Sequence, residues 1–321
     1  MGRLLLLGLA IVLGLAAPAA ADYPDKPVRL IVPFIAGSTP DTAARRIAQR
    51  LTVDLGQQVI VENRPGAAGN IGAEVAARAP ADGYTLMLIA SSHTINPALY
   101  RGLKYDIVKD FAPICLLQRG MNLMVVPPAL PVKTVQEFIA LAKKEPGKLY
   151  YASGGNGSPA HLSAEAFRLA AGIDYTHVPY KGAPEIVRAL LADQVQAGFP
   201  TFDAAYGQAR QGLLRPLAVT GEKRSKVLPD VPTMLEVFGP QKGFVIDGWL
   251  GLAAPAGTPR EAIDRIAAAM KKASEDPAFR DGLEGIGNEA VFLGPAAFAD
   301  MLPGDVRKWD ALVKAIGAKL D

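Results

Sequence analysis

A unit of strand, loop and helix recurs along this chain and limits the available folds more than any other feature. Residues 28–32 have the apolar, β-branched pattern of a strand, and a short loop leads from them to a helix expected to start at Pro40. Residues 59–61 and 84–90 predict two further strands, again with helical sequence between them. Strands and helices alternating in this order predict a parallel α/β sheet.

The same order restarts after the proline-rich residues 127–131. A helix over 134–144 is followed by a strand over 149–152, a loop of Gly, Ser and Asn over 153–158, and another helix with Pro159 at its first position. With ~150 residues as the usual domain size, a chain of 321 residues has room for two such modules.

The N-terminus predicts a secretory signal peptide over residues 1–21. Arg3 precedes an apolar run over 4–15, and the alanines at 19–21 form a small-residue cleavage site. The run is shorter than the ~20 residues of a spanning helix, which argues against the alternative of a retained anchor. We expect the mature protein to begin near Asp22 and to be periplasmic.

The charge pattern argues against a nucleic-acid partner, and the cysteine content excludes an intramolecular disulfide. The net charge is +3, and 34 basic residues are interspersed with 31 acidic ones without a basic block, so no nucleic acid is expected. Cys115 is the single cysteine, so no intramolecular disulfide can form, and it is expected to be a small buried apolar residue.

Known catalytic motifs are absent. The three histidines have no metal-ligand spacing, and there is no GxSxG elbow, phosphate loop or GxGxxG fingerprint. No motif places a base beside a nucleophile. We therefore expect no enzyme activity, no metal and no cofactor.

The junctions between strands and helices offer a different chemistry. The loops at 36–41, 91–92, 153–158 and 180–184 each lead into a helix, whose first free N–H groups attract an anion without a basic side chain. Simpler interpretations stay open. The turns are also ordinary helix starts, His161 is a candidate structural donor, Asp41 suits its helix dipole, and Lys181 is a candidate solvated side chain.

Motifs at these loops follow the order of one known family over nearly the whole mature chain. They include VPFIAG at 32–37, VENRPG at 61–66, ADGYTL at 81–86, HVPYKG at 177–182 and APAGTP at 254–259. In these motifs the chain resembles the extracytoplasmic solute receptors of tripartite tricarboxylate transporters, the TctC or Bug family.

The resemblance implies an α/β protein with the type II periplasmic-binding-protein fold. Two Rossmann-like α/β domains, the first formed by 22–122 and 228–321 and the second by 123–227, would be joined by crossing strands and close on a ligand in the cleft. The ligand would be a small carboxylate, held largely by backbone amides and water and delivered to the integral membrane subunits of a transporter. A monomer is the default for such receptors.

The resemblance also implies the ligand-binding residues. One wall of the cleft would be formed by Phe34, Ala36, Gly37 and Asp41. The facing wall would be formed by Ser153, Asn156, Ser158 and Lys181. Ser91 and Ser92 would lie at the floor. Gly155 and His161 in the same loop and first helical turn complete the second wall. The family usually has a second glycine where this chain has Ser38, and a polar residue where it has Pro200; Thr201 is the candidate replacement for that contact.

The nature of the carboxylate stays open. Without an arginine fork in the matched loops, a di- or tricarboxylate, an aromatic acid and an acidic amino acid are all compatible with the sequence. Two rival functions are a ligand-bound sensor that signals to a membrane protein and, less favoured, an enzyme on the same fold. We expect Asp41→Asn to change ligand affinity more than stability.

Overall fold

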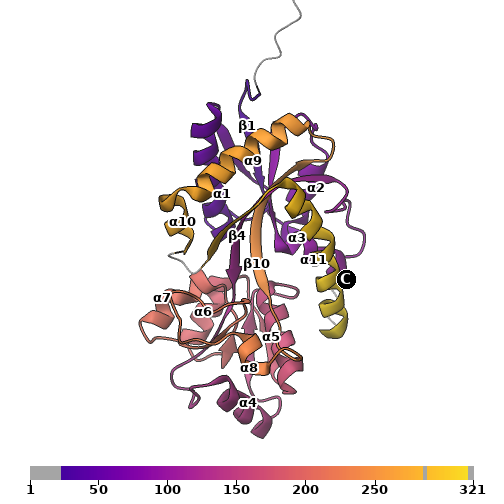
Figure 1. Cartoon of the computed structure of the whole chain (residues 1–321). Helices are drawn as coiled ribbons and strands as arrows, with labels where there is room; N and C mark the ends of the chain where they lie inside the picture. Colours follow the sequence, from indigo (N-terminus) through magenta and orange to yellow (C-terminus); the bar gives the residue numbers. More distant parts are fainter. Residues whose placement is uncertain (1–22, 285–287, 317–321) are drawn as a thin grey trace, which may run out of the picture.

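The computed structural model describes residues 23–284 and 288–316, in which two β-sheets are each flanked by helices (Figure 1). The strand order is β11-β4-β10-β3-β1-β2 in one sheet and β7-β6-β8-β5-β9 in the other. We call each sheet with its helices lobe 1 and lobe 2, respectively. The predicted signal peptide lies outside the described residues. Within them, no helix combines the length and apolar character needed to cross a membrane.

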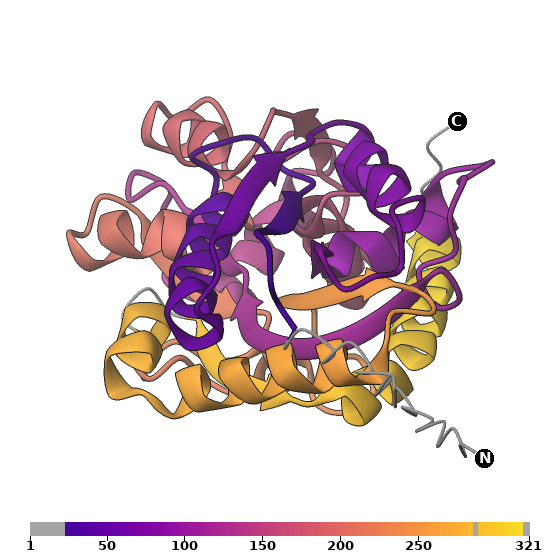
Figure 2. The same cartoon turned by 90° about the horizontal axis from the view of Figure 1, so that it is seen from above.

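Lobe 1 is a sheet covered on both faces. Successive residues of a strand point to opposite faces, so Leu30 packs toward α1 and α9, and Ile31 packs on the side of α2 and α11. Figure 2, which looks down on this lobe, shows α9 (orange) and α2 (purple) on opposite sides of the sheet. The elements are β1 (Val28–Val32), α1 (Thr39–Leu55), β2 (Val59–Asn63), a 3₁₀ turn (Ala67–Gly69), α2 (Asn70–Ala77), β3 (Thr85–Ala90), α3 (Ser91–Leu99), β4 (Phe111–Met121), β10 (Asp247–Pro255), α9 (Arg260–Glu275), α10 (Pro277–Glu284), β11 (Glu289–Leu293) and α11 (Pro295–Ile316).

Lobe 2 is built around one apolar core that includes Phe138, Phe167 and Phe199. Val231, just before α8, and Met234, its first residue, are buried in the same core. The chain therefore returns to lobe 1 only after α8. The domain ranges expected from the sequence stay a prediction. The elements are β5 (Leu123–Val126), α4 (Val135–Lys144), β6 (Tyr150–Ser153), α5 (Pro159–Ala171), β7 (Thr176–Pro179), α6 (Ala183–Leu191), β8 (Ala197–Gly198), α7 (Phe202–Arg210), β9 (Arg215–Val219) and α8 (Met234–Phe238).

Both chain crossings between the lobes, at Asn122 and Ile246, are hydrogen-bonded to Thr220, which directly follows β9. The buried Thr220 accepts from Asn122 N through Oγ1 (2.9 Å) and donates its own N–H to Asn122 O (3.0 Å). The Thr220 hydroxyl also donates to Ile246 O (2.6 Å), and Asn122 Nδ2 donates to Ser163 Oγ (2.9 Å). These bonds fix the hinge at one point, next to the long antiparallel pair β4 and β10.

An apolar cluster also joins the lobes. Trp309 and Val313 of α11 are buried against Leu99 of α3 in lobe 1 and Leu162 of α5 in lobe 2. Figure 1 shows α11 descending from lobe 1 toward α5. The long C-terminal helix therefore packs on both lobes.

Several local predictions need correction. The sheets are mixed: β1, β2 and β3 are parallel as expected, but β10 pairs antiparallel with β3 and β4. The sequence also predicts Thr258 as the N-cap of a helix with Pro259 at its first position. The Thr258 hydroxyl instead donates to Pro255 O (2.8 Å), and Pro259 itself occupies the N-cap position of α9. The sequence offers Thr39 or Ser38 as the N-cap of a helix that starts at Pro40; α1 begins at Thr39, and Ser38 is its N-cap. Cys115 is fully buried, as predicted.

Candidate functional site

The loop between β1 and α1 is held by the buried carboxylate of Asp41. Its Oδ2 accepts from Gly37 N (2.8 Å) and Arg45 Nε (3.0 Å), and its Oδ1 accepts from Asn63 Nδ2 (2.8 Å). Burial alone would raise the pKa of Asp41, but these hydrogen bonds outweigh it and hold the pKa below the ordinary value. All three partners belong to lobe 1. Asp41 thus shapes this loop, in which Gly37 adopts a positive φ of 79°.

Beside this loop, α3 begins with two serines directly after β3. Ser91 is buried, and Ser92 Oγ is buried without a hydrogen-bond partner among the described residues. His93 accepts from Ala90 N through Nδ1 (3.0 Å), and its ring meets Phe34 edge-on at 6.0 Å. Complete burial lowers the pKa of His93 to about 4, so it is a neutral structural residue at pH 7.

In lobe 2, the glycine-rich loop after β6 is folded around Ser153. This fully buried serine lies 2.6 Å from His177 Nε2 through its Oγ, which also accepts from Gly155 N (3.1 Å). Ser158 caps α5 by accepting from His161 N (3.2 Å), and His161 Nδ1 accepts from Gly157 N (3.1 Å). Side chains from both ends of the loop therefore hold its backbone in place.

Four aromatic rings stack beneath this loop. Tyr151 contacts Tyr175 at 4.4 Å and His177 at 4.8 Å between ring centroids, and His177 contacts His161 at 4.5 Å. Burial and the neighbouring His161 lower the pKa of His177 to about 4, although Glu165 opposes the shift. Burial likewise lowers the pKa of His161. Both imidazoles are therefore neutral at pH 7, and the predicted role of His161 in ligand binding stays a prediction.

The close approach of Ser153 and His177 corrects one argument from the sequence, because a base does lie beside a nucleophile here. The residues are far apart in sequence, so no local motif reveals the pair. Ser153 has no exposed surface, and its hydroxyl is already shared with the backbone of Gly155. In this geometry the Ser153–His177 pair stabilises the loop after β6, and the Ser153 hydroxyl is not accessible as a nucleophile.

Strand topology brings the predicted loops to two facing edges. Since β1 and β3 are parallel, the loops that start α1 and α3 lie at one edge of lobe 1. Since β6 is parallel to both β7 and β8, the loops before α5, α6 and α7 lie at one edge of lobe 2. A hydrogen bond from Thr39 Oγ1 at the start of α1 to Asp203 Oδ2 in the first turn of α7 (2.8 Å) joins the two edges. We call this bond the latch.

Other predicted residues have fewer contacts. Ala36, Asn156 and Lys181 are exposed, and Lys181 N donates to Glu185 (2.9 Å). Thr201 is exposed at the N-cap of α7, without a capping bond from its side chain. In the part of the chain that the structure describes, the side chains of these four residues have no hydrogen bond or ion pair to the opposite lobe.

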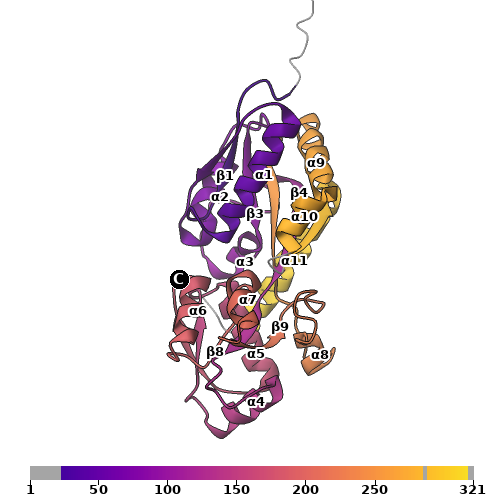
Figure 3. The same ribbon diagram turned by 90° about the vertical axis from the view of Figure 1, so that its left-hand side faces the viewer.

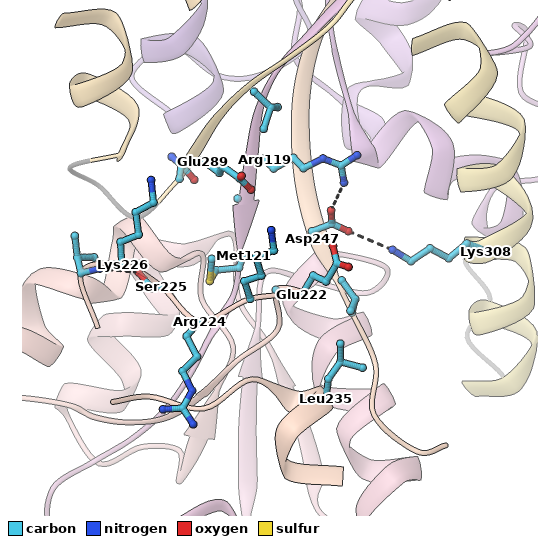
Figure 4. Close-up of a pocket in the computed structure, with 17 residues that line it drawn as sticks. Arg119, Met121, Glu222, Arg224, Ser225, Lys226, Leu235, Asp247, Glu289 and Lys308 are labelled. Atoms are coloured by element: carbon cyan, nitrogen blue, oxygen red, sulfur yellow. Dashed lines mark hydrogen bonds and ion pairs between the residues drawn. The ribbon is translucent and has the colours of Figure 1, made fainter. Parts of the chain in front are cut away.

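The sequence did not reveal a cavity at the hinge of about 640 Å³ (Figure 4). We call it the hinge cavity. Its wall includes Arg119 and Asp247 of the crossing strands and Lys308 of α11, and the Asp247 carboxylate bridges the two cations at 2.6 and 3.2 Å. None of the predicted ligand-binding residues lines it. Across residues 23–284 and 288–316, no group of three His, Cys, Asp or Glu side chains is placed to hold a metal ion.

Comparison with known proteins identifies the family. The profile of the tripartite tricarboxylate transporter family receptor, TctC, matches residues 43–318. The chain belongs to this family. Among its relatives, the protein BugT of Bordetella pertussis is 35% identical over 310 residues, covering 96% of this chain and 94% of BugT. An uncharacterised-family protein from the gbd 5′ region of Cupriavidus necator is 37% identical, covering 95% and 93%.

Solved structures of TctC relatives share this fold. An R. palustris protein solved with adipate has a TM-score of 0.84 at 34% identity, covering 93% of this chain and 100% of the other. MatC of Rhodopseudomonas palustris, solved with bound malate, has a TM-score of 0.78 at 30% identity, covering 91% and 100%. The periplasmic binding protein BugD gives 0.81 at 32% identity, covering 92% and 100%. The predicted two-lobed α/β binding-protein fold is therefore confirmed, and the chain is a TctC-type solute-binding receptor.

Proposed function

We propose that this receptor captures a small carboxylate between the facing edges of its lobes in the periplasm and delivers it to the membrane subunits of a tripartite tricarboxylate-type transporter. The observation that carries the proposal is the latch between Thr39 and Asp203, which brings helix starts of the two lobes to within one hydrogen bond. Two TctC relatives with the same fold are solved with dicarboxylates, adipate and malate.

The chemistry of the facing edges suits an anion. Helices α1, α3 and α5 begin there, and the first N–H groups of each carry partial positive charge. At the floor, Ser92 Oγ is buried and unpartnered among the described residues, so it is available to donate to a carboxylate. Asp41 does not oppose the ligand as a free charge, because Arg45, Asn63 and Gly37 already hold its carboxylate.

Closure provides the capture mechanism. A ligand that contacts both edges stabilises the closed arrangement more than the open one, so binding shifts the population toward closure. The closed surface is then available to the membrane subunits. Catalysis has no part in this proposal, since the Ser153–His177 pair is buried and used in the loop.

A thermal-shift panel of carboxylates on residues 22–321, unfolded and refolded to remove bound material, tests the proposal. A ligand at ~100 times its Kd adds about 2.7 kcal/mol of stability, which raises Tm by several degrees. Ser92→Ala is expected to weaken binding of the responding carboxylate about fivefold without loss of stability, because the hydroxyl has no partner to lose in the free protein. Ser274→Ala, on the exposed side of α9, is the matched control.

Two results would count against this function. One is a flat response to mono-, di- and tricarboxylates, aromatic acids and acidic amino acids after refolding. The other is a responding ligand whose affinity is the same in Ser92→Ala and the wild type.

A further inference from the structure

The hinge cavity has walls from both lobes. Arg119 lies on β4, Asp247 on β10 and Lys308 on α11 (Figure 4). Lys223 belongs to the loop 221–227, which follows β9 in lobe 2. Its volume of about 640 Å³ falls within the ~300–1,000 Å³ typical of small-molecule sites. In Figure 3, α8 lies on the same side of the molecule as α10, and α6 lies on the opposite side with α2. The hinge cavity, which α8 borders through Leu235, is therefore separate from the loop that starts α6.

The hinge cavity carries excess positive charge. Five basic side chains line it against three acidic ones, and one of the five, Arg224, is paired with Glu236 outside the lining (2.9 Å), which leaves a formal excess of one positive charge. One of the three acids, Asp247, already bridges Arg119 and Lys308. The charged lining residues are Arg119, Lys223, Arg224, Lys226, Lys308, Glu222, Asp247 and Glu289.

A buried amide in the same wall lacks an acceptor. Asn288 is only 9% exposed, and its Nδ2 has no hydrogen-bond partner among the described residues. An unpaired buried donor costs free energy, so such a group in a cavity wall indicates an acceptor from a ligand. This donor and the surrounding cations select the same kind of ligand, one with negatively charged oxygens.

We propose that the hinge cavity is a second binding site, which takes a small organic polyanion with two or three carboxylates. The Asn288 amide and the cations of lobe 1 hold one end, and Lys223 of lobe 2 approaches the other. Because the walls come from both lobes, a bound anion ties them together beside the crossing strands. The latch and the cavity are present in the same structure, so the closed arrangement leaves room for an anion in the cavity.

Hydrogen–deuterium exchange with citrate as the probe tests this site apart from the facing edges. Citrate is expected to slow exchange in residues 119–121 and 221–227. Lys223→Glu is expected to raise the citrate concentration for half-maximal protection about fivefold, because it replaces an attraction with a repulsion. Asn288→Asp, which turns the donor into an acceptor at nearly constant size, is expected to act in the same direction. Lys271→Glu, an exposed change of the same charge on α9, is the matched control.

Three results would overturn the proposal. Protection confined to residues 153–158 would place citrate at the facing edges and leave the proposed function intact. Equal midpoints for Lys223→Glu and Lys271→Glu would remove the cavity from citrate binding. The same protection by sodium chloride at matched ionic strength would reduce the effect to charge screening. Thermal melts of both cavity variants confirm that they are folded.

Discussion

The buried contacts of Asp41 revise the expectation from the sequence: Asp41→Asn should weaken folding at least as much as ligand binding, because one carboxylate fixes the loop that starts α1. Its two oxygens accept three hydrogen bonds, from Gly37, Arg45 and Asn63. An asparagine in either orientation turns its NH₂ toward at least one of these donors. Such a mismatch at a site with 2% exposure costs about 2 kcal/mol. At roughly 2–4 °C per kcal/mol, Tm falls by about 4 °C or more.

A matched control separates the loop from general instability. Asp54 also lies on α1 with a side chain 9% exposed, and it pairs with Arg50 and Lys272 far from the start of the helix. Asp54→Asn is expected to destabilise the protein without changing affinity, whereas Asp41→Asn weakens ligand binding about tenfold. Urea unfolding and calorimetric titration with the responding carboxylate measure the two effects. Equal loss of affinity in both variants, or wild-type stability in Asp41→Asn, would refute the reasoning.

The pH dependence supplies a further check on Asp41. Its pKa lies below the ordinary value in the folded protein, so its contribution to stability is complete above the unfolded pKa of ~4 and is lost as pH falls through the folded pKa. The difference in unfolding free energy between wild type and Asp41→Asn should therefore shrink below pH ~4. A difference that stays constant to pH 3 would show that the charge of Asp41 contributes nothing.

Three other changes test separate parts of the structure. Removing the latch by Thr39→Val or Asp203→Ala should lower carboxylate affinity about threefold to tenfold in calorimetry, since one hydrogen bond of the closed form is lost. Unchanged affinity in both variants would exclude the latch from closure. The pKa of His177 is lowered to about 4, so the folded state binds fewer protons than the unfolded state below pH ~6.5, and the free energy of unfolding falls between pH 6.5 and 4. In urea unfolding, His177→Gln should show a smaller fall over this range. An equal fall in the variant and the wild type would contradict this cause. Gly251→Ala should cost about 2 kcal/mol in urea unfolding, because its Cβ would lie 2.5 Å from Cys115 O; a loss under 0.5 kcal/mol would show that β10 shifts freely.

The sequence predicted the helix starts well because they depend on local chemistry. Pro159 starts α5 as predicted, because the fixed φ of proline suits the first helical position, and Ser38, one of two candidates, caps α1. Ser158 caps α5 in the same way. The antiparallel strands β4 and β10 were harder, because their pairing joins residues more than a hundred positions apart. An apolar run predicts a buried strand but not its neighbour or its direction.

The site was predicted in its loops but not in its contacts. Ser92 lies in the first turn of α3, Gly37 in the loop before α1 and Ser153 at the end of β6, which are the strand–helix junctions that the motifs indicate. Their contact with a ligand stays a prediction. No sequence pattern shows that His177 would approach Ser153, because two parallel strands and the helix between them bring these residues together. No sequence pattern predicts the hinge cavity, because its charged residues come from both lobes, including α11 of lobe 1.

The central claim, capture of a carboxylate by closure of the lobes, is tested most directly by a distance across the two edges. Spin labels at Gln49→Cys on α1 and Gly207→Cys on α7 sit at exposed positions, and a Cβ at Gly207 meets no atom within 4 Å. Cys115 is fully buried, so it stays unlabelled. In refolded protein, the carboxylate found in the panel should convert a broad, longer distance distribution into a single shorter one. An unchanged distribution at saturating ligand would contradict the account.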